Sequence, residues 1–366
     1  MLFRRFYDNG LAQASYMLAC ERSSEAIVVD PNMDLETYLR AARDEGVRIV
    51  AVTETHIHAD FASGSRALAH ATGAQLYVSA EGGEDWQYGF AGETGVRTLR
   101  DGDDITIGMV RIGVRHTPGH TPEHLTFLVA DLARADSPVG AMTGDFVFVG
   151  DVGRPDLLER AAGQVGTMHA AAASLYRSLA SFKKLPDHLQ IWPGHGAGSA
   201  CGKAMSSAAQ STLGYERVAN WAFAPMSESE FVERVLDGQP VAPPYFGAMK
   251  LRNRDAAVPR KHMLPRMIAA DEVAAVFPDD GVVIVDVRNE DEWASGHIPN
   301  AVLIPLPALH GRLGEIPRDR PLIVHCQRGS RSAAAAATLD AFGFDDVHDL
   351  VGGFSAWEAA GHPVAR

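Results

Sequence analysis

Four polar motifs of this chain each stand directly after a short apolar run. Such runs are typical of buried strands, and the loops that leave one edge of a sheet can converge on a single point. The side chains placed in this way are His56, His58, Asp60, His120, Asp145 and His195. Imidazole and carboxylate groups are ligands for a borderline transition metal ion. The shared position of the motifs therefore predicts an α/β fold whose loops assemble a metal site.

The length of 366 residues is too great for one ordinary core and predicts two domains. Residues 1–225 alternate strand-like runs with helical segments, residues 226–264 read as a turn-rich linker, and residues 265–366 read as a small α/β domain with a parallel sheet. Strands are predicted at 26–30, 48–53, 109–114, 189–192, 282–286 and 321–325, and helices at 35–45, 167–182 and 330–342.

The net charge and the cysteine content limit the cellular compartment and the binding partners that we expect for this chain. A net charge of −13 makes nucleic acid and anionic membranes poor partners, because both need a basic footprint. The three cysteines, Cys20, Cys201 and Cys326, are too few and too scattered for a disulfide framework, which predicts a reducing cytoplasm. No leader peptide and no membrane span are expected. The sequence does not decide whether the chain forms a homo-oligomer.

Phe61 follows the first motif and bears on the number of metal ions. In two-metal hydrolases with an H-x-H-x-D motif, a histidine at this place holds the second ion. Its absence favours one metal ion with open coordination positions. Two-metal hydrolysis stays as an alternative, with Asp145 bridging the ions and Asp60 and His195 serving the second one.

The order H-x-H-x-D, P-G-H, T-G-D, P-G-H resembles the metallo-β-lactamase fold superfamily, which implies an αββα sandwich over residues 1–225. Phe61 and the segment 143–156 are similar to its persulfide dioxygenase branch. That resemblance implies one Fe(II) per chain held by His56, His120 and Asp145. His58, Asp60 and His195 would then lie outside the ligand set, with Asp60 either orienting a neighbour or capping the following helix.

A second constellation surrounds Cys326. A buried strand runs into this residue, and a loop with Gly329 and an alanine-rich helix follow. The helix dipole, the backbone N–H groups and the nearby guanidinium groups of Arg328 and Arg331 favour the thiolate form. The spacing from Cys326 to Arg331 is C-x4-R, one residue shorter than the C-x5-R loop of protein phosphatases, and it fits a sulfur anion better than phosphate.

The segments 286–301 and 352–357 resemble the two rhodanese signatures. This resemblance implies sulfur transfer through Cys326, with Arg331 closing the loop. Together the two halves predict a bifunctional enzyme, similar to bacterial persulfide dioxygenase–rhodanese fusions, that oxidises a small thiol persulfide with O2 to sulfite and exchanges sulfur with thiosulfate or sulfite.

The expected substrate contacts and the competing functions complete these predictions. Possible contacts are Arg154, Lys203, Tyr215, Arg328, Gly329 and Ser330, with Lys250 and Arg252 as further basic candidates. The alternatives are a two-zinc glyoxalase II-type thioester hydrolase fused to a sulfurtransferase, and a non-oxidising sulfur carrier. The sequence does not distinguish glutathione, coenzyme A and bacillithiol as the thiol.

Overall fold

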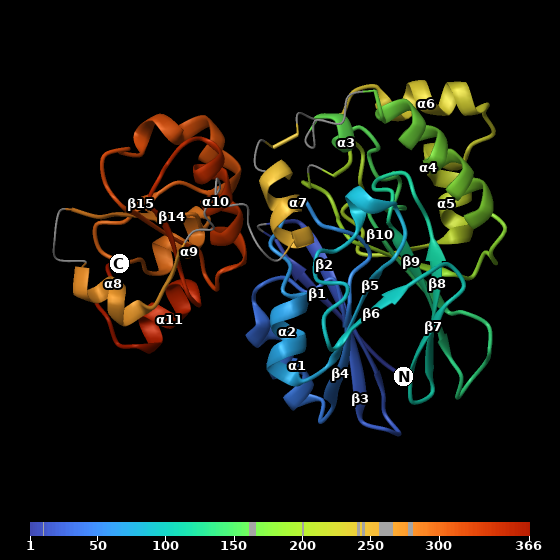
Figure 1. Ribbon diagram of the computed structural model, residues 1–366, viewed down its shortest axis with the longest axis horizontal. Helices are drawn as coiled ribbons and strands as arrows, with labels where there is room; N and C mark the ends of the chain where they lie inside the picture. The colour runs from blue at the N-terminus through green and yellow to red at the C-terminus, as the bar shows by residue number, and fades with distance from the viewer. Residues whose placement is uncertain are drawn as a thin grey trace.

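The computed structural model describes residues 1–9, 11–160, 166–199, 201–239, 242–243, 246–255, 266–276 and 281–366. Figure 1 shows a large N-terminal lobe built on two sheets and a smaller C-terminal lobe built on one. The predicted α/β class, a sandwich followed by a domain with a parallel sheet, is confirmed.

The two sheets of the large lobe are both mixed. The first has the order β1-β2-β3-β4-β5-β6 and the second the order β12-β11-β10-β9-β8-β7. Their strands are β1 Leu2–Asp8, β2 Gln13–Cys20, β3 Glu25–Val29, β4 Arg48–Thr53, β5 Gln75–Ser79, β6 Val96–Leu99, β7 Asp104–Ile107, β8 Val110–His116, β9 Leu125–Asp131, β10 Gly140–Gly144, β11 Gln190–Pro193 and β12 Ser211–Thr212. The helices are α1 Leu35–Asp44, α2 Ser65–Thr72, α3 Leu157–Arg160, α4 Met168–Phe182, α5 Leu213–Ala219, α6 Glu228–Leu236 and α7 Phe246–Asp255, with short 3-10 turns η1 Glu84–Trp86 and η2 Trp221–Phe223.

The core of the large lobe has three layers of apolar contact. One lies between the two sheets and includes Leu18, Ile27 and Phe127. A second packs α1 and α2 on the outer face of the first sheet, and a third packs α4 and α6 on the second sheet. All eight residues of β2 are buried, which is expected of a strand that is covered on both faces.

The described part of the segment 226–264, predicted as a linker, contains the helices α6 and α7. Helix α6 begins with a capping box formed by Ser227 and Glu230, and it buries Phe231 and Val235 against the neighbourhood of α4. The pair Ser227 and Glu230, three residues apart, is a helix-start signal that is local in the sequence. The predicted domain bounds themselves remain a prediction.

The small lobe is a parallel sheet with helices around it. The strand order is β13-β17-β16-β14-β15. The strands are β13 Arg266–Ile268, β14 Val283–Asp286, β15 Val302–Leu303, β16 Leu322–His325 and β17 Val347–Leu350, and the helices are α8 Ala270–Val276, α9 Glu290–Ser295, α10 Ser330–Ala341 and α11 Gly353–Ala359, with the 3-10 segment η3 Leu306–Glu315. Strands β14 and β16 pair in register, which places Asp286 beside His325 at their carboxyl ends.

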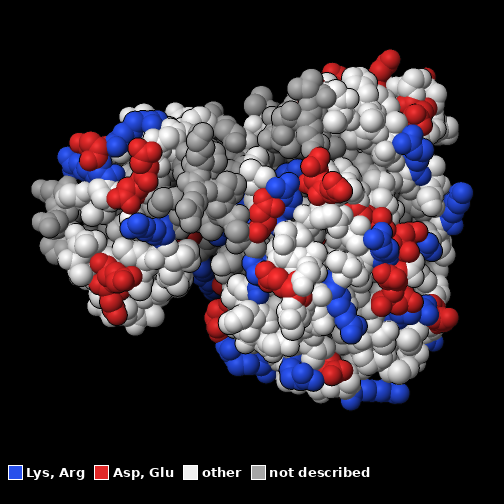
Figure 2. Space-filling model, in the orientation of Figure 1, with Lys and Arg blue, Asp and Glu red and all other residues white. Residues whose placement is uncertain are grey.

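The two lobes touch through α7 and α10. Met249 of α7 is buried in an apolar cluster with Ala62 of the large lobe and with Ala333 and Ala334 of α10. We call these residues the interdomain cluster. Figure 1 shows α10 on the side of the small lobe that faces the large one. Figure 2 shows acidic and basic side chains interspersed over the visible face. None of the described helices is long and apolar enough to cross a membrane.

Candidate functional site

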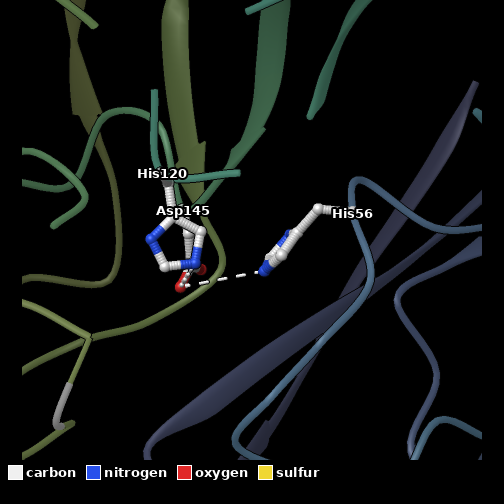
Figure 3. A group of neighbouring side chains, drawn as sticks. All are labelled: His56, His120 and Asp145. Carbon is white, nitrogen blue, oxygen red and sulfur yellow. Dashed lines mark ion pairs between the residues drawn. The ribbon is translucent and has the colours of Figure 1, made fainter. Parts of the chain in front are cut away.

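The structure brings His56, His120 and Asp145 together from three separate strands. His56 follows β4, His120 follows β8, and Asp145 follows β10. One ligand atom from each lies within 4.8 Å of the others, and all three side chains are buried. Figure 3 shows the ring nitrogens of both histidines turned toward the carboxylate. This is the convergence that the sequence predicted, although His56 and His120 come from loops 64 residues apart in the chain.

The hydrogen bonds of the imidazoles fix which nitrogen carries the proton. His120 Nδ1 lies 3.0 Å from the carbonyl oxygen of Arg154, which can only accept, so Nδ1 is the N–H. His56 Nδ1 lies 2.9 Å from Thr55 Oγ1, whose own proton goes to Asp30. Both histidines therefore present an Nε2 lone pair to the cluster.

These lone pairs face a carboxylate rather than a donor. His120 Nε2 lies 3.5 Å and His56 Nε2 4.0 Å from Asp145 Oδ2. Neither carboxylate oxygen of Asp145 has a hydrogen-bond partner among the described residues. Burial lowers the pKa of both histidines, which favours the neutral, metal-binding form. A buried carboxylate facing two lone pairs is stabilised by a bound cation, so the donor set fits a transition metal ion.

Glycines let the backbone approach this cluster closely. Gly144 has a φ of +47°, and a Cβ there would lie 2.5 Å from Thr55 Oγ1 and 2.8 Å from His124 Nε2. A Cβ at Gly194 would lie 2.8 Å from Asp145 Oδ1. The glycines that precede Asp145 and His195 in the sequence are therefore required by packing at the site, as expected.

Asp30 is a residue of this site that the sequence interpretation missed. Its Oδ1 accepts from the backbone N–H of Thr55 at 2.7 Å and contacts His58 Nε2 at 3.0 Å, and its Oδ2 accepts from the Thr55 hydroxyl at 2.9 Å. Asp30 thus holds both histidines of the first motif, His58 directly and His56 through Thr55. The signal was present, because Asp30 also ends a buried strand run, but it was read only as part of the strand.

His58 is not one of the three residues whose ligand atoms meet in this cluster: its Nε2 contacts Asp30, and its Nδ1 is buried without a hydrogen-bond partner among the described residues. The Asp30 carboxylate outweighs the opposing effect of burial and raises the pKa of His58 to about 9. The ring packs against Phe61, with centroids 4.3 Å apart, and Phe61 is fully buried. Phe61 therefore fills the space beside this imidazole with apolar surface.

A second group of possible ligands lies on the other side of Asp145. It consists of Asp60, His195 and Cys201, whose ligand atoms also lie within 4.8 Å of one another. His195 Nδ1 donates to the carbonyl of Ala12 at 2.9 Å, and its Nε2 lies 3.1 Å from Asp60 Oδ2 and 3.4 Å from Asp145 Oδ1. Burial opposes the charged form of His195, but the carboxylates of Asp145 and Asp60 raise its pKa well above the ordinary value.

Two expectations for this group are now resolved. Asp60 does not cap the following helix, because α2 begins at Ser65 with Gly64 as its N-cap. Its carboxylate instead faces His195. For Cys201 the sequence leaves two interpretations, a loop thiol with no role and a thiol near the site; the structure places it beside His195, where burial raises the pKa of its thiol to about 12. Cys20, by contrast, packs in the core between the sheets, as predicted.

The small lobe forms a separate reactive loop around Cys326. Strand β16 ends at His325, Cys326 is fully buried, and the backbone N–H of Gly329 donates to its Sγ at 3.0 Å. Helix α10 starts at Ser330, so its N-terminus lies next to the sulfur. The predicted strand–cysteine–helix arrangement is confirmed. An N–H donor and a helix N-terminus both stabilise negative charge on sulfur.

The two arginines of the loop have different partners. Arg331 donates two bonds of 2.7 Å to the carboxylate of Glu292 in α9, so it closes the loop against that helix. Arg328 crosses to the large lobe, where it lies 3.2 Å from Asp34 and donates to Thr37 at 3.0 Å. The guanidinium predicted to contact a substrate therefore also joins the two domains.

Several of the other predicted substrate contacts are not supported. Arg154 is fully buried and pairs with Asp156, so its guanidinium is not available to a ligand. Lys203 donates to the carbonyls of Arg234 and Asp237 at the end of α6. Both were predicted as possible contacts from their charge alone, because their partners are set by tertiary packing. Tyr215 is 61% exposed on α5 and stays a prediction. The side chain of Ser330 lies outside the described residues.

The two further basic candidates are also engaged within the protein. Lys250 is largely buried, with Nζ 3.3 Å from the ring centroid of Trp86, and burial lowers its pKa to about 8. Arg252 lies close enough to Asp349 of β17 to lower the pKa of that carboxyl, which burial raises. Arg252 thus faces the small lobe.

Comparison with known proteins agrees with this two-part architecture. The metallo-beta-lactamase superfamily model matches residues 8–195, and the rhodanese-like domain model matches residues 269–360. The crystal structure of a metallo-beta-lactamase from Staphylococcus aureus is 35% identical with a TM-score of 0.72, covering 96% of this chain and 99% of that one.

Two curated relatives resemble the large lobe at similar distances. The persulfide dioxygenase ETHE1 of Bos taurus is 30% identical over 53% of this chain and 68% of its own length. A hydroxyacylglutathione hydrolase of Polaromonas is 32% identical over 53% of this chain and 66% of its own length. Identity alone therefore does not separate an oxygen-dependent reaction from a hydrolytic one.

Proposed function

The chain belongs to the metallo-beta-lactamase superfamily and carries a C-terminal rhodanese-like domain, and from this we propose that it oxidises a small thiol persulfide and transfers sulfur through Cys326. The first reaction is R–S–SH + O2 + H2O → R–SH + SO3²⁻ + 2 H⁺. The proposed cofactor is one Fe(II) per chain, and the proposed partners are a thiol persulfide, O2, and thiosulfate or sulfite.

The observation that supports this choice is the donor set around Asp145. Two neutral imidazoles and one carboxylate are the ligands that non-haem Fe(II) oxygenases use, with the remaining positions open. His58, the second histidine of the first motif, lies outside this group of ligand atoms, and its Nε2 contacts Asp30 at 3.0 Å. Phe61 occupies the place where a two-metal hydrolase has a further histidine.

In this proposal His56, His120 and Asp145 would hold the ion, which when bound supplies adjacent positions for O2 and for the persulfide sulfur. The protein's own groups fix the ligands. Thr55 and the carbonyl of Arg154 hold the two imidazoles in the tautomer that leaves Nε2 bare. The buried rings of Phe61 and Phe148 exclude water from the surroundings of His58 and His195.

The rhodanese-like domain contributes a sulfur carrier. In the loading step the Cys326 thiolate attacks the outer sulfur of thiosulfate, Cys326–S⁻ + S–SO3²⁻ → Cys326–S–S⁻ + SO3²⁻. The Gly329 N–H, 3.0 Å from Sγ, stabilises the thiolate before the step and after the sulfur has left. Joining the two activities in one chain raises the local concentration of the intermediate that they share.

One specific observation favours a second candidate, a two-metal thioester hydrolase fused to the sulfurtransferase. The group Asp60, His195 and Cys201 offers three ligand atoms on the far side of Asp145. With an ion in each group, Asp145 would bridge the two, as hydrolysis by a metal-bridged hydroxide requires.

Oxygen uptake distinguishes the candidates. Fe(II)-loaded protein supplied with glutathione persulfide should consume O2 and release sulfite in a one-to-one ratio. The same protein should not hydrolyse S-lactoylglutathione. Hydrolysis of the thioester without oxygen uptake would favour the two-metal candidate, and sulfur transfer alone would leave a non-oxidising sulfur carrier.

A further inference from the structure

A cavity of about 570 Å³ lies between the two domains. On the large lobe its wall is formed by the end of β1, by the loop before α1 and by α1 itself, including Asp34, Thr37 and Arg40. On the small lobe the wall is formed by the start of α9 and the Cys326 loop, including Asp291, Arg328 and Arg331. Its volume is within the range of about 300–1,000 Å³ that is usual for sites of drug-sized ligands.

The cavity borders the Cys326 loop, although Cys326 itself is fully buried and does not line it. The loop residues that follow the cysteine, Gln327, Arg328 and Arg331, all line it. Arg328 contacts Asp34 and Thr37 across the cavity, so the loop is turned toward the large lobe. A molecule that exchanges sulfur with Cys326 from this side therefore meets residues of both domains.

The charges on the walls are mixed. Three arginines and four carboxylates line the cavity: Arg40, Arg328, Arg331, Asp8, Asp34, Asp291 and Glu292. Arg328 pairs with Asp34, and Arg331 pairs with Glu292. Among the described residues, the side chains of Arg40 and Asp291 make no ion pair and no hydrogen bond, and they come from different domains.

This arrangement distinguishes two kinds of sulfur acceptor. A small inorganic dianion would fill little of the space and would meet an excess of carboxylates. A peptide-sized thiol with an ammonium group and a carboxylate would fill more of it and could place the carboxylate on Arg40 and the ammonium group on Asp291.

We propose that this interdomain cavity is the binding site for the thiol that accepts sulfur from Cys326, with Arg40 and Asp291 as its specificity-determining residues. The inference rests on the proposed sulfur transfer and adds that the large lobe supplies half of the acceptor site. The acceptor is a zwitterionic thiol of peptide size.

The persulfide anion left by the loading step first takes a proton from water, and the transfer step then balances without an oxidant or reductant. The thiolate of the acceptor attacks the outer sulfur of the Cys326 persulfide, so that Cys326–S–SH + R–S⁻ → Cys326–S⁻ + R–S–SH. The S–S bond to Cys326 breaks, a new S–S bond forms on the acceptor, and the electron pair returns to Cys326 Sγ beside the Gly329 N–H.

The test is steady-state sulfur transfer from saturating thiosulfate in the full chain, with glutathione and cyanide as alternative acceptors. Cyanide lacks both charged ends. For Arg40→Ala we expect the ratio of kcat/KM for glutathione to kcat/KM for cyanide to fall about tenfold, as expected for loss of one charge-assisted hydrogen bond. Arg43→Ala is the matched control, since Arg43 lies one turn further along α1, pairs with Glu36 and does not line the cavity.

A second variant tests the other end of the acceptor. Asp291→Asn should lower transfer to glutathione and to cysteine, but it should not lower transfer to 3-mercaptopropionate, which has no ammonium group. An unchanged ratio in Arg40→Ala, or an equal fall in Arg43→Ala, would overturn the proposal. Absence of transfer to every acceptor, cyanide included, in the unaltered chain would instead count against the proposed sulfurtransferase function.

Discussion

The Oγ1 hydroxyl of Thr55 accepts the Nδ1–H of His56 across 2.9 Å. The hydroxyl donates its own proton to Asp30, so one side chain fixes the tautomer of the first proposed metal ligand and ties it to a buried carboxylate. Partners of this kind orient metal-binding histidines and raise their basicity.

Thr55→Val should weaken Fe(II) binding about 10- to 100-fold, because it removes this partner while keeping the shape of the side chain. Affinity would be measured by competition with a chromogenic chelator. Thr53→Val, at the last residue of β4, is a matched control, since Thr53 Oγ1 is buried and has no hydrogen-bond partner in the described part of the chain. An equal loss of affinity in both variants would show that the Thr55 hydroxyl has no special role.

Separate replacements of His120 and of His195 should show whether the site binds one metal ion or two. Both imidazoles donate from Nδ1 to a backbone carbonyl and direct Nε2 toward Asp145, at 3.5 and 3.4 Å. With a single iron held by His56, His120 and Asp145, His120→Gln should lose most of its iron, and His195→Gln should retain it. Metal analysis of the two purified, folded variants checks this, and loss from both would favour a two-metal centre.

Cys326→Ser should separate the two activities. The hydroxyl cannot carry a persulfide, so thiosulfate-dependent sulfur transfer should fall to background, whereas oxygen uptake with supplied glutathione persulfide should persist. Cys20→Ser should leave both activities intact, because Cys20 packs in the core between the sheets of the large lobe. If Cys326→Ser also abolished oxygen uptake in a folded protein, the domains could not be treated as separable.

Asp349 should make stability fall as the pH rises toward neutrality. Burial raises the pKa of this carboxyl from 3.8 to about 7, although Ser332 and Arg252 oppose the rise. Between these values the folded state binds more protons than the unfolded state, so the contribution of Asp349 is fully present below about pH 4 and is lost as the pH rises to 7, by at most about 1.4 kcal/mol per pH unit.

Denaturant unfolding between pH 4 and pH 8 tests this contribution. Asp349→Asn removes the titrating group and should flatten the slope relative to the unaltered protein. Asp345→Asn, in the exposed turn before β17, should keep the original slope. Parallel curves for Asp349→Asn and the unaltered protein would mean that Arg252 compensates the buried charge.

Much of the fold was predictable because its strands are short apolar runs bounded by turn residues. The run predicted at 48–53 is β4, Arg48–Thr53, and the helix predicted at 330–342 is α10, Ser330–Ala341. His56, His120 and Asp145 were predicted to converge for the same reason, since residues that follow strand ends at one edge of a sheet become neighbours.

The contacts that could not be predicted from the sequence join segments that lie far apart along the chain. Asp30 acts on Thr55 across 25 residues, and Arg328 meets Asp34 across 294 residues. Lys203 was predicted as a possible substrate contact because nothing near it in sequence indicates that the carbonyl groups at the end of α6 lie within reach. Such partners depend on how complete elements dock, and no local pattern encodes them.

The interdomain cluster of Ala62, Met249, Ala333 and Ala334 has a consequence for how such fusions arise. Without the large lobe, Ala333 and Ala334 of α10 would lose their contact with Met249 and Ala62. Grafting another sulfurtransferase in place of residues 265–366 would leave Met249 against an ill-fitting surface, with the cysteine loop no longer aimed at Asp34. The two halves are therefore expected to have diverged as a matched pair, inherited together rather than exchanged as interchangeable parts.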